Sequence, residues 1–151
     1  MKKLWIFVLI FSSYGSWASS LTEEKAISKL NQFFELLDLE VYQKENISKI
    51  LTNDFHIFEM GKAWNMDEFD EFIQEASKTT ISTDWVLSNY VVSIDENSAH
   101  ISYVNDGVFK TTDNELVISN WLESVYLVKE GGELKLKFLQ SDLVSRETKP
   151  N

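Results

Sequence analysis

The sequence predicts a single α+β domain, in which helices pack on one face of an antiparallel sheet. Apolar residues recur at helical spacing in the first half of the chain, and from Thr83 onward they alternate with polar residues, as in strands. Gly131-Gly132, between two of these alternating segments, is typical of a two-residue hairpin loop. A run of helices followed by a run of strands indicates the α+β class, because each element must bury its apolar face.

Residues 1–18 are expected to be a secretory signal peptide. Two lysines precede the apolar run Leu4–Phe11, which is far shorter than the roughly 20 residues a helix needs to cross a bilayer. The small side chains of Ser16 and Ala18 predict cleavage after Ala18, which leaves residues 19–151 as one domain. An uncleaved anchor is the alternative. The expected location is periplasmic or secreted.

The composition narrows the range of partners. The chain has no cysteine and a formal net charge of −10, and loss of the two signal lysines makes it more negative. Such a surface repels nucleic acid and disfavours anionic membranes, and no basic amphipathic stretch opposes this. We therefore expect neither nucleic acid nor, after signal cleavage, a membrane as partner.

The first half of the chain predicts three helices and one strand. Two Ser/Thr/Asn-to-Glu patterns, at residues 20–23 and 65–68, are capping boxes that mark helix starts. The expected elements are a helix running to about Asp38, a short helix Glu45–Leu51, a strand Phe55–Met60, and a helix that begins at Met66.

The second half predicts four antiparallel strands. Asn105-Asp106-Gly107 lies inside one of them and is expected to form a bulge or a kink. The expected strands are Thr83–Ile94, Ser98–Phe109, Glu115–Lys129 and Glu133–Ser141, after which the chain is expected to fray toward Pro150.

The hairpin on Gly131-Gly132 predicts a face that is apolar near the turn and polar at its far end. Such a face can line a pocket for a largely apolar ligand with one polar group. The alternative is that the far end is solvated and its polar pair is an ordinary cross-strand contact. Placing Glu130 opposite Glu133 pairs Leu127 with Leu136, Val125 with Phe138, Glu123 with Gln140, and Trp121 with Asp142.

This order of elements resembles the nuclear transport factor 2-like superfamily, which includes ketosteroid-isomerase-like and polyketide-cyclase-like proteins. The resemblance implies a cystatin-like cone, in which a strongly curved antiparallel sheet holds the N-terminal helices in its concave face and leaves a hydrophobic pocket. It also implies that the outer sheet face often forms a homodimer. The residues that carry it are the amphipathic helix Lys29–Leu37, the strand Asp54–Gly61, the helix from Met66, and the hairpin around Glu130–Glu133 that ends in Gln140–Asp142.

The resemblance also suggests a catalytic alternative. In isomerase-like members a carboxylate at the end of the first strand is the general base, and Glu59 occupies the matching place. Those members stabilise the oxyanion with a tyrosine from the first helix and a protonated acid from the sheet. Phe33 stands at the helix position here and cannot donate a hydrogen bond, so the larger catalytic contribution is missing. Isomerase- or cyclase-like activity is therefore the alternative, with Glu123 or Gln140 polarising the substrate.

The candidate pocket residues carry no metal or cofactor signature. His56 and Glu59 are three residues apart and should lie on opposite faces of a strand, and no zinc spacing or calcium loop occurs. Tyr103 joins the pocket only if its strand presents that side inward. The expected pocket residues are Glu59, Tyr103, Trp121, Glu123 and Gln140.

The sequence thus favours an exported domain that binds a small apolar ligand or acts as a dimeric interaction module, without catalysis. A third possibility is that Phe58, Trp121 and Phe138 fill the cavity, so that only the outer sheet face is functional. The hairpin residues expected on that outer face are Tyr126, Lys135, Lys137 and Leu139.

Overall fold

A computed structural model describes residues 20–151. The expected signal peptide, residues 1–18, lies outside the described residues. Within the described range, none of the helices combines the length and the apolar character needed to span a bilayer.

Three helices form in the first half of the chain, as predicted. α1 (Glu23–Leu37) is capped by Thr22, whose Oγ1 accepts from the backbone N–H of Lys25 at 3.3 Å; the capping box expected from Ser20 does not form. α2 (Lys44–Ser48) and α3 (Met66–Ala76) follow, and α3 begins with the predicted capping box.

Helix α2 is shorter than predicted, because the chain leaves it for a strand earlier than the helical spacing suggests. Leu51 is the first residue of β1 (Leu51–Glu59), and its side chain is buried in the core. A short strand that the sequence did not predict, β2 (Lys62–Asn65), returns antiparallel to β1 after a two-residue turn at Met60-Gly61. Both turn residues have positive φ, 52° at Met60 and 73° at Gly61.

Four long strands complete a six-stranded sheet with the order β2-β1-β6-β5-β4-β3. All neighbours are antiparallel except β1 and β6, which are parallel and bring the first and last strands together. The long strands are β3 (Thr80–Ile94), β4 (Ser98–Thr111), β5 (Glu115–Glu130) and β6 (Glu133–Pro150).

The last strand runs well beyond its predicted end at Ser141. Its C-terminal part pairs with the start of β5 as far as Glu115 opposite Pro150, so this proline belongs to the sheet and the expected fraying is wrong. Pro lacks a backbone donor and is accommodated at the strand's last residue. The extension brings Arg146 opposite Ser119, on the inner face of the sheet.

The predicted hairpin register is correct at the turn and wrong beyond it. Leu127 pairs with Leu136 as expected, but the register then shifts by one residue, and Tyr126 pairs with Phe138. A bulge explains the shift, because the extra residue of β6 at this point has no partner on β5. Side chains beyond the bulge therefore change faces: Glu123 pairs with Ser141 instead of Gln140, and Leu139 is buried on the inner face.

The bulge expected at residues 105–107 does not form. Strand β4 pairs continuously with β5 through this segment, and the neighbouring irregularity lies in β3 between Ser88 and Val91. Gly107 has another reason to be glycine. A Cβ there would lie 2.9 Å from the ring of Trp121 and 3.1 Å from that of Trp85, closer than packed carbon atoms approach.

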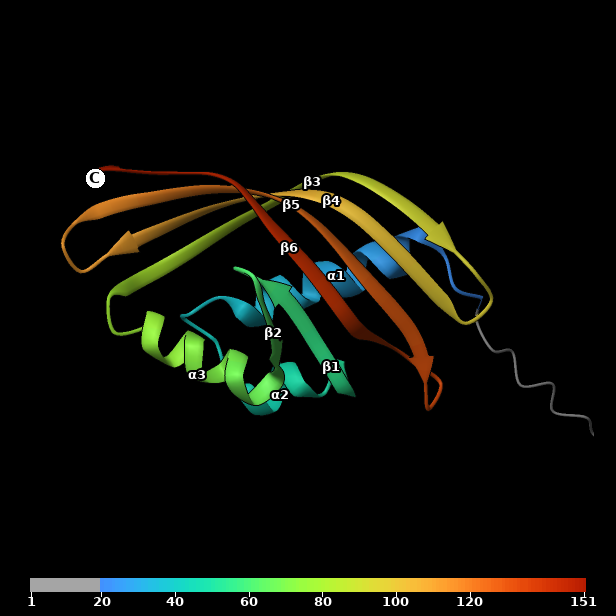
Figure 1. The fold of residues 1–151 in the computed structure, drawn as a ribbon. Coiled ribbons are helices and arrows are strands. Elements are labelled where there is room, and N and C mark those ends of the chain that lie inside the picture. Colours follow the sequence, from blue (N-terminus) through green and yellow to red (C-terminus); the bar gives the residue numbers. More distant parts are fainter. Residues whose placement is uncertain (1–19) are drawn as a thin grey trace, which may run out of the picture.

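The sheet curves strongly over the helices, which lie on its concave side (Figure 1). The main core sits between α1 and the inner faces of β1, β4, β5 and β6. This arrangement confirms the predicted α+β cone with helices in the concave face. The largest fully buried apolar side chains of the core are Leu30, Phe33, Ile47, Ile101, Leu127, Leu136 and Leu139.

Candidate functional site

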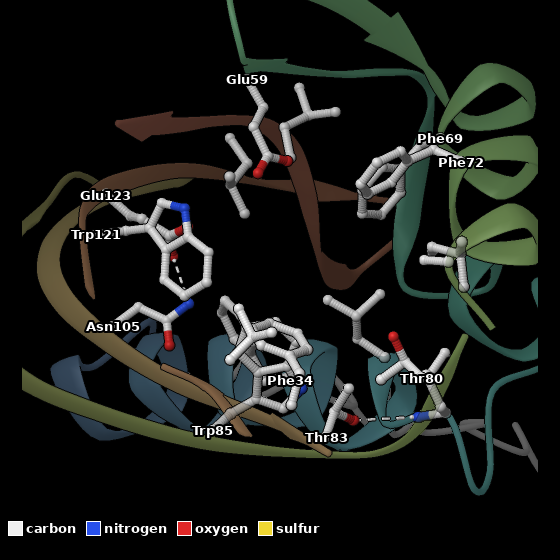
Figure 2. A pocket seen from close by; sticks show the side chains of 18 of the residues that line it. Phe34, Glu59, Phe69, Phe72, Thr80, Thr83, Trp85, Asn105, Trp121 and Glu123 are labelled. Atoms are coloured by element: carbon white, nitrogen blue, oxygen red, sulfur yellow. Dashed lines mark hydrogen bonds between the residues drawn. The ribbon is translucent and has the colours of Figure 1, made fainter. Parts of the chain in front are cut away.

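A cavity of about 250 Å³ lies between α1, α3 and the concave face of the sheet. Most of its wall is aromatic and aliphatic, with a few polar groups that converge from the sheet (Figure 2). A mostly apolar, concave site with a small number of polar groups is typical of small-molecule binding. Its main apolar wall is made by Phe33, Phe34 and Leu37 of α1, Phe69, Phe72 and Ile73 of α3, and Trp85, Phe109, Trp121 and Leu139 of the sheet.

The polar wall is centred on Glu123, whose carboxyl group is bonded from both neighbouring strands. Ser141 Oγ donates to Glu123 Oε1 at 2.7 Å, and Asn105 Nδ2 donates to Glu123 Oε2 at 3.2 Å. All three side chains are buried. The remaining polar atom of Asn105, its Oδ1, is buried without a protein partner, so an acceptor is left over in the wall of the cavity.

The pKa of Glu123 is raised to about 7, mainly by burial and to a smaller extent by the nearby charge of Glu59. Bonds from Ser141 and Asn105 and the nearby Tyr103 hydroxyl favour the ionised form and oppose this shift, but the loss of hydration outweighs them. The Glu123 carboxyl group therefore changes its charge near neutral pH. When protonated it can donate a hydrogen bond to a ligand, and when ionised it can only accept.

A second carboxyl group and one cation line the same cavity. Burial raises the pKa of Glu59, which lies at the end of β1, while the charge of Arg146 lowers it. Arg146 comes from the extension of β6; its Nε donates to Ser119 Oγ at 2.9 Å, and its guanidinium lies 5.9 Å from the centre of the Trp121 ring. The Arg146 side chain is largely exposed, which places it at the rim.

Three aromatic rings from adjacent strands form one side of the cavity. The Trp85 and Phe109 rings are nearly perpendicular with centroids 5.2 Å apart, and Trp121 lies 6.0 Å from Trp85. These rings close around the backbone of Gly107, which explains why no side chain is tolerated there. The Nε1 donor of Trp85 is buried without a protein partner.

Helix α3 supplies the opposite wall. Phe69 and Phe72 face the cavity in Figure 2, and Phe72 also packs against Trp64, with ring centroids 5.4 Å apart. Tyr42 and Lys44 fix this helix from outside. The Tyr42 hydroxyl donates to Asp70 at 2.7 Å, and Lys44 Nζ lies 2.7 Å from Asp67 Oδ1.

Three of the five residues expected in the pocket line the cavity together: Glu59, Trp121 and Glu123. Tyr103 faces inward but is buried in the core behind the cavity wall. Its hydroxyl lies near enough to Glu123 to influence the pKa of that group, but no residue in the range 20–151 forms a hydrogen bond of good geometry with it. Gln140 does not join them. The bulge in β6 turns it outward, where it is exposed and pairs with Ser124.

The cavity is not filled by the three aromatic residues that the sequence allowed as plugs. Phe58 and Phe138 lie on the outer face, where their ring centroids are 5.1 Å apart and where His56 contacts both. Only Trp121 lies on the inner side, and it forms wall instead of filler. Within residues 20–151, no three acidic or histidine side chains are grouped so as to hold a metal ion.

Arg146 and Ser141 were missed by sequence reasoning for a shared reason. Both lie beyond the bulge, and Arg146 also lies in the part of β6 that was expected to be frayed. A usable signal for Arg146 was its uniqueness, since no other arginine occurs in this acidic sequence.

No family model and no curated protein matches this sequence. Solved structures do match. A hexachlorocyclohexane dehydrochlorinase from Novosphingobium barchaimii is similar with a TM-score of 0.67 and 8% identity, covering 82% of this chain and 89% of the other. A Nostoc punctiforme protein of unknown function with a cystatin-like fold has a TM-score of 0.65 and 14% identity, with 83% and 95% covered.

A third similar structure is the association domain of CaMKII from C. elegans. Its TM-score is 0.61 at 18% identity, and the match covers 79% of this chain and 94% of that one. Identities this low establish a shared fold and no more. The three structures confirm the cystatin-like fold, and they confirm the predicted resemblance at the level of the fold.

Proposed function

We propose that this chain, which has the fold of the nuclear transport factor 2-like superfamily, is an exported domain that binds a small, largely apolar molecule in the cavity. The observation that carries the proposal is an open cavity with mainly apolar walls and a few polar groups, of which Glu123 is held by hydrogen bonds from both neighbouring strands. Ligand-binding sites commonly combine a mainly apolar lining with a few fixed polar groups that orient the ligand.

The Glu123 wall supports a ligand with one hydrogen-bonding group. The carboxyl group is held by Ser141 and Asn105, so little side-chain entropy is lost when it meets a ligand. Below pH about 7 it is protonated and can donate, and Asn105 Oδ1 remains available as an acceptor. An alcohol or a carbonyl compound with an aromatic or alkyl body fits this arrangement.

Tryptophan fluorescence tests the binding proposal, because Trp85 and Trp121 line the cavity. We expect titration with neutral phenylpropanol to change the emission of the wild-type protein in a saturable way. Glu123→Ala should weaken binding several-fold, because it removes the polar group, whereas Gln140→Ala on the outer face should not. Emission that does not respond to any apolar probe would refute the proposal.

Proton-transfer catalysis is a second candidate, favoured by the presence of two carboxyl groups in one cavity. In this alternative, ionised Glu59 removes a proton from a carbon next to a ketone carbonyl. Protonated Glu123 donates a hydrogen bond to the carbonyl oxygen, which becomes the enolate oxygen, and Glu59 then returns the proton to carbon. Burial of both groups supports these roles, because it raises the pKa of each.

Deuterium exchange separates catalysis from binding alone. If the chain is an enzyme of this kind, NMR should show deuterium from solvent entering the α-carbon of a cyclic ketone faster with wild-type protein than without it. Glu59→Gln should abolish the acceleration while leaving binding of phenylpropanol. Equal exchange rates with and without protein would reject this second candidate.

The outer sheet face supports the proposal that two copies associate through it. We name the outer patch by its members Phe58, Leu122, Tyr126 and Phe138. Leu122 is 56% exposed and Phe58 42%, and exposed apolar side chains on one sheet face are typical of an interaction surface. One of the similar solved structures is an association domain, that of C. elegans CaMKII.

A further inference from the structure

Arg146 lies at the rim of the cavity and forms no ion pair with any residue in the range 20–151. Its Nε donates to the neutral hydroxyl of Ser119, and one face of the guanidinium lies over Trp121. Among residues 20–151, no side chain bonds the two terminal amino groups of this guanidinium. Ser119 is itself 1% exposed, so the point that anchors the arginine is rigid.

The lack of a carboxylate partner is unusual in this chain, which carries ten more acidic than basic groups. Among residues 20–151, the ion pairs that form are made by lysines: Lys44 with Asp67 and Asp70, Lys78 with Glu75, Lys135 with Glu130, and Lys137 with Asp54. Glu59 lies near enough to affect Arg146 electrostatically but does not form an ion pair with it.

We infer that the rim group Arg146 binds the carboxylate of a small aromatic or alkyl carboxylic acid whose apolar body occupies the cavity. This inference rests on the proposed binding function and narrows its ligand class. A guanidinium presents its donors in a planar fork that matches a carboxylate, and among the described residues Arg146 is the one basic side chain in the cavity lining. The apolar body of such an acid would contact the rings of Phe72 and Trp85, as the apolar body of a neutral ligand would.

The carboxyl group of Glu59 opposes the binding of a carboxylate at Arg146. It is the other charged group near Arg146 in the cavity, and when ionised it repels an incoming carboxylate and competes for the guanidinium. Glu123, deeper in the wall, adds to this repulsion when it ionises above pH about 7. Carboxylate binding should therefore strengthen as the pH falls from 8 toward 6, because Glu123 loses its negative charge over this range.

The test compares phenylpropanoate with phenylpropanamide, which differ in charge but hardly in shape, by calorimetric titration of the full mature chain at pH 7. We expect the wild-type protein to bind the acid about tenfold more tightly than the amide, the order of one charge-assisted hydrogen-bonded pair. Arg146→Gln should remove this preference. Glu59→Gln should increase it, because the variant removes the charge that competes for the guanidinium.

The outcomes are distinguishable. If the amide binds and the acid binds no more tightly, or if Arg146→Gln keeps the preference, the carboxylate inference is wrong and the binding proposal stands. If neither compound binds the wild-type protein, both proposals fail. Circular dichroism of each variant checks the fold, and the comparison of acid with amide in the wild type needs no variant at all.

Discussion

Ser141 Oγ donates a hydrogen bond of 2.7 Å to Glu123 Oε1, across the last two strands of the sheet. The contact exists because a bulge in β6 shifts the register by one residue and places a hydroxyl where a longer amide would otherwise stand. A short donor holds the Glu123 carboxyl group against the sheet. The cavity in front of it therefore stays open.

Glu123 should make the stability of the protein depend on pH. Its pKa is about 7 in the folded state and near 4.5 when exposed, so the folded state binds more protons between these values. The contribution of Glu123 to the free energy of unfolding should therefore be complete below pH 4.5. It should decrease by about 3 kcal/mol as the pH rises through 7. Denaturant unfolding at pH 5 and pH 8 measures this.

Glu123→Gln provides the matched variant. A neutral amide cannot ionise, and Asn105 can rotate its amide to offer the unpartnered Oδ1 to the new Nε2. We expect the variant to lose less stability between pH 5 and pH 8 than the wild type and to exceed it at pH 8. Identical pH profiles would show that Glu123 does not titrate in this range.

Gly107→Ala should destabilise the protein and disturb the cavity. The new methyl group would lie 2.9 Å from the Trp121 ring, so that ring or the backbone must move. The expected loss is about 1–3 kcal/mol of unfolding free energy, with a change in intrinsic tryptophan emission. Ser93→Ala, at an exposed position of β3, should stay within about 0.5 kcal/mol of the wild type. Tolerance of Gly107→Ala would contradict the packing described.

Met60→Asn should stabilise the turn between β1 and β2. Met60 is 55% exposed and has φ 52°, a left-handed conformation that Asn adopts more readily than Met. We expect a gain of about 1 kcal/mol in thermal or denaturant unfolding. Met60→Leu should give no gain, because leucine has no such preference. An equal effect of the two variants would mean that the turn carries no conformational cost.

The outer patch predicts a dimer that one charge can disrupt. We expect light scattering to give twice the monomer mass for the wild type, and Leu122→Glu to give the monomer mass, since burying an unpaired carboxylate in an apolar interface is costly. Ser93→Glu on the same face but at the exposed edge strand should remain a dimer. A wild-type protein with the monomer mass would refute the proposal that two copies associate through the outer patch.

The sequence was a good guide to the class of fold and to most element positions. Helical spacing and capping residues located α1 and α3, and alternation located the long strands, because these signals are local to each element. The Gly-Gly turn also gave the first pairs of the hairpin correctly. The positions of all these elements are determined by residues that are neighbours along the chain.

The parts that failed depend on contacts between distant segments. The bulge in β6 turns the Gln140 side chain outward, and no residue type at the bulge indicates its presence in the sequence. The extension of β6 to Pro150 forms because β5 offers a free edge, and this extension is what delivers Arg146 to the rim. Strand β2 is only four residues long, too short for a pattern of its own.

Calorimetric titration of neutral phenylpropanol into the wild-type protein and into Ala76→Phe tests most directly whether the cavity holds a ligand. Ala76 lines the cavity from α3, so a phenyl group there should fill it, whereas Ala63→Phe adds the same group at an exposed position of β2 as a control. We expect saturable binding with a negative change in heat capacity in the wild type and the control, and no binding in Ala76→Phe. Absence of binding to the wild type, or undiminished binding to Ala76→Phe, would contradict the binding proposal.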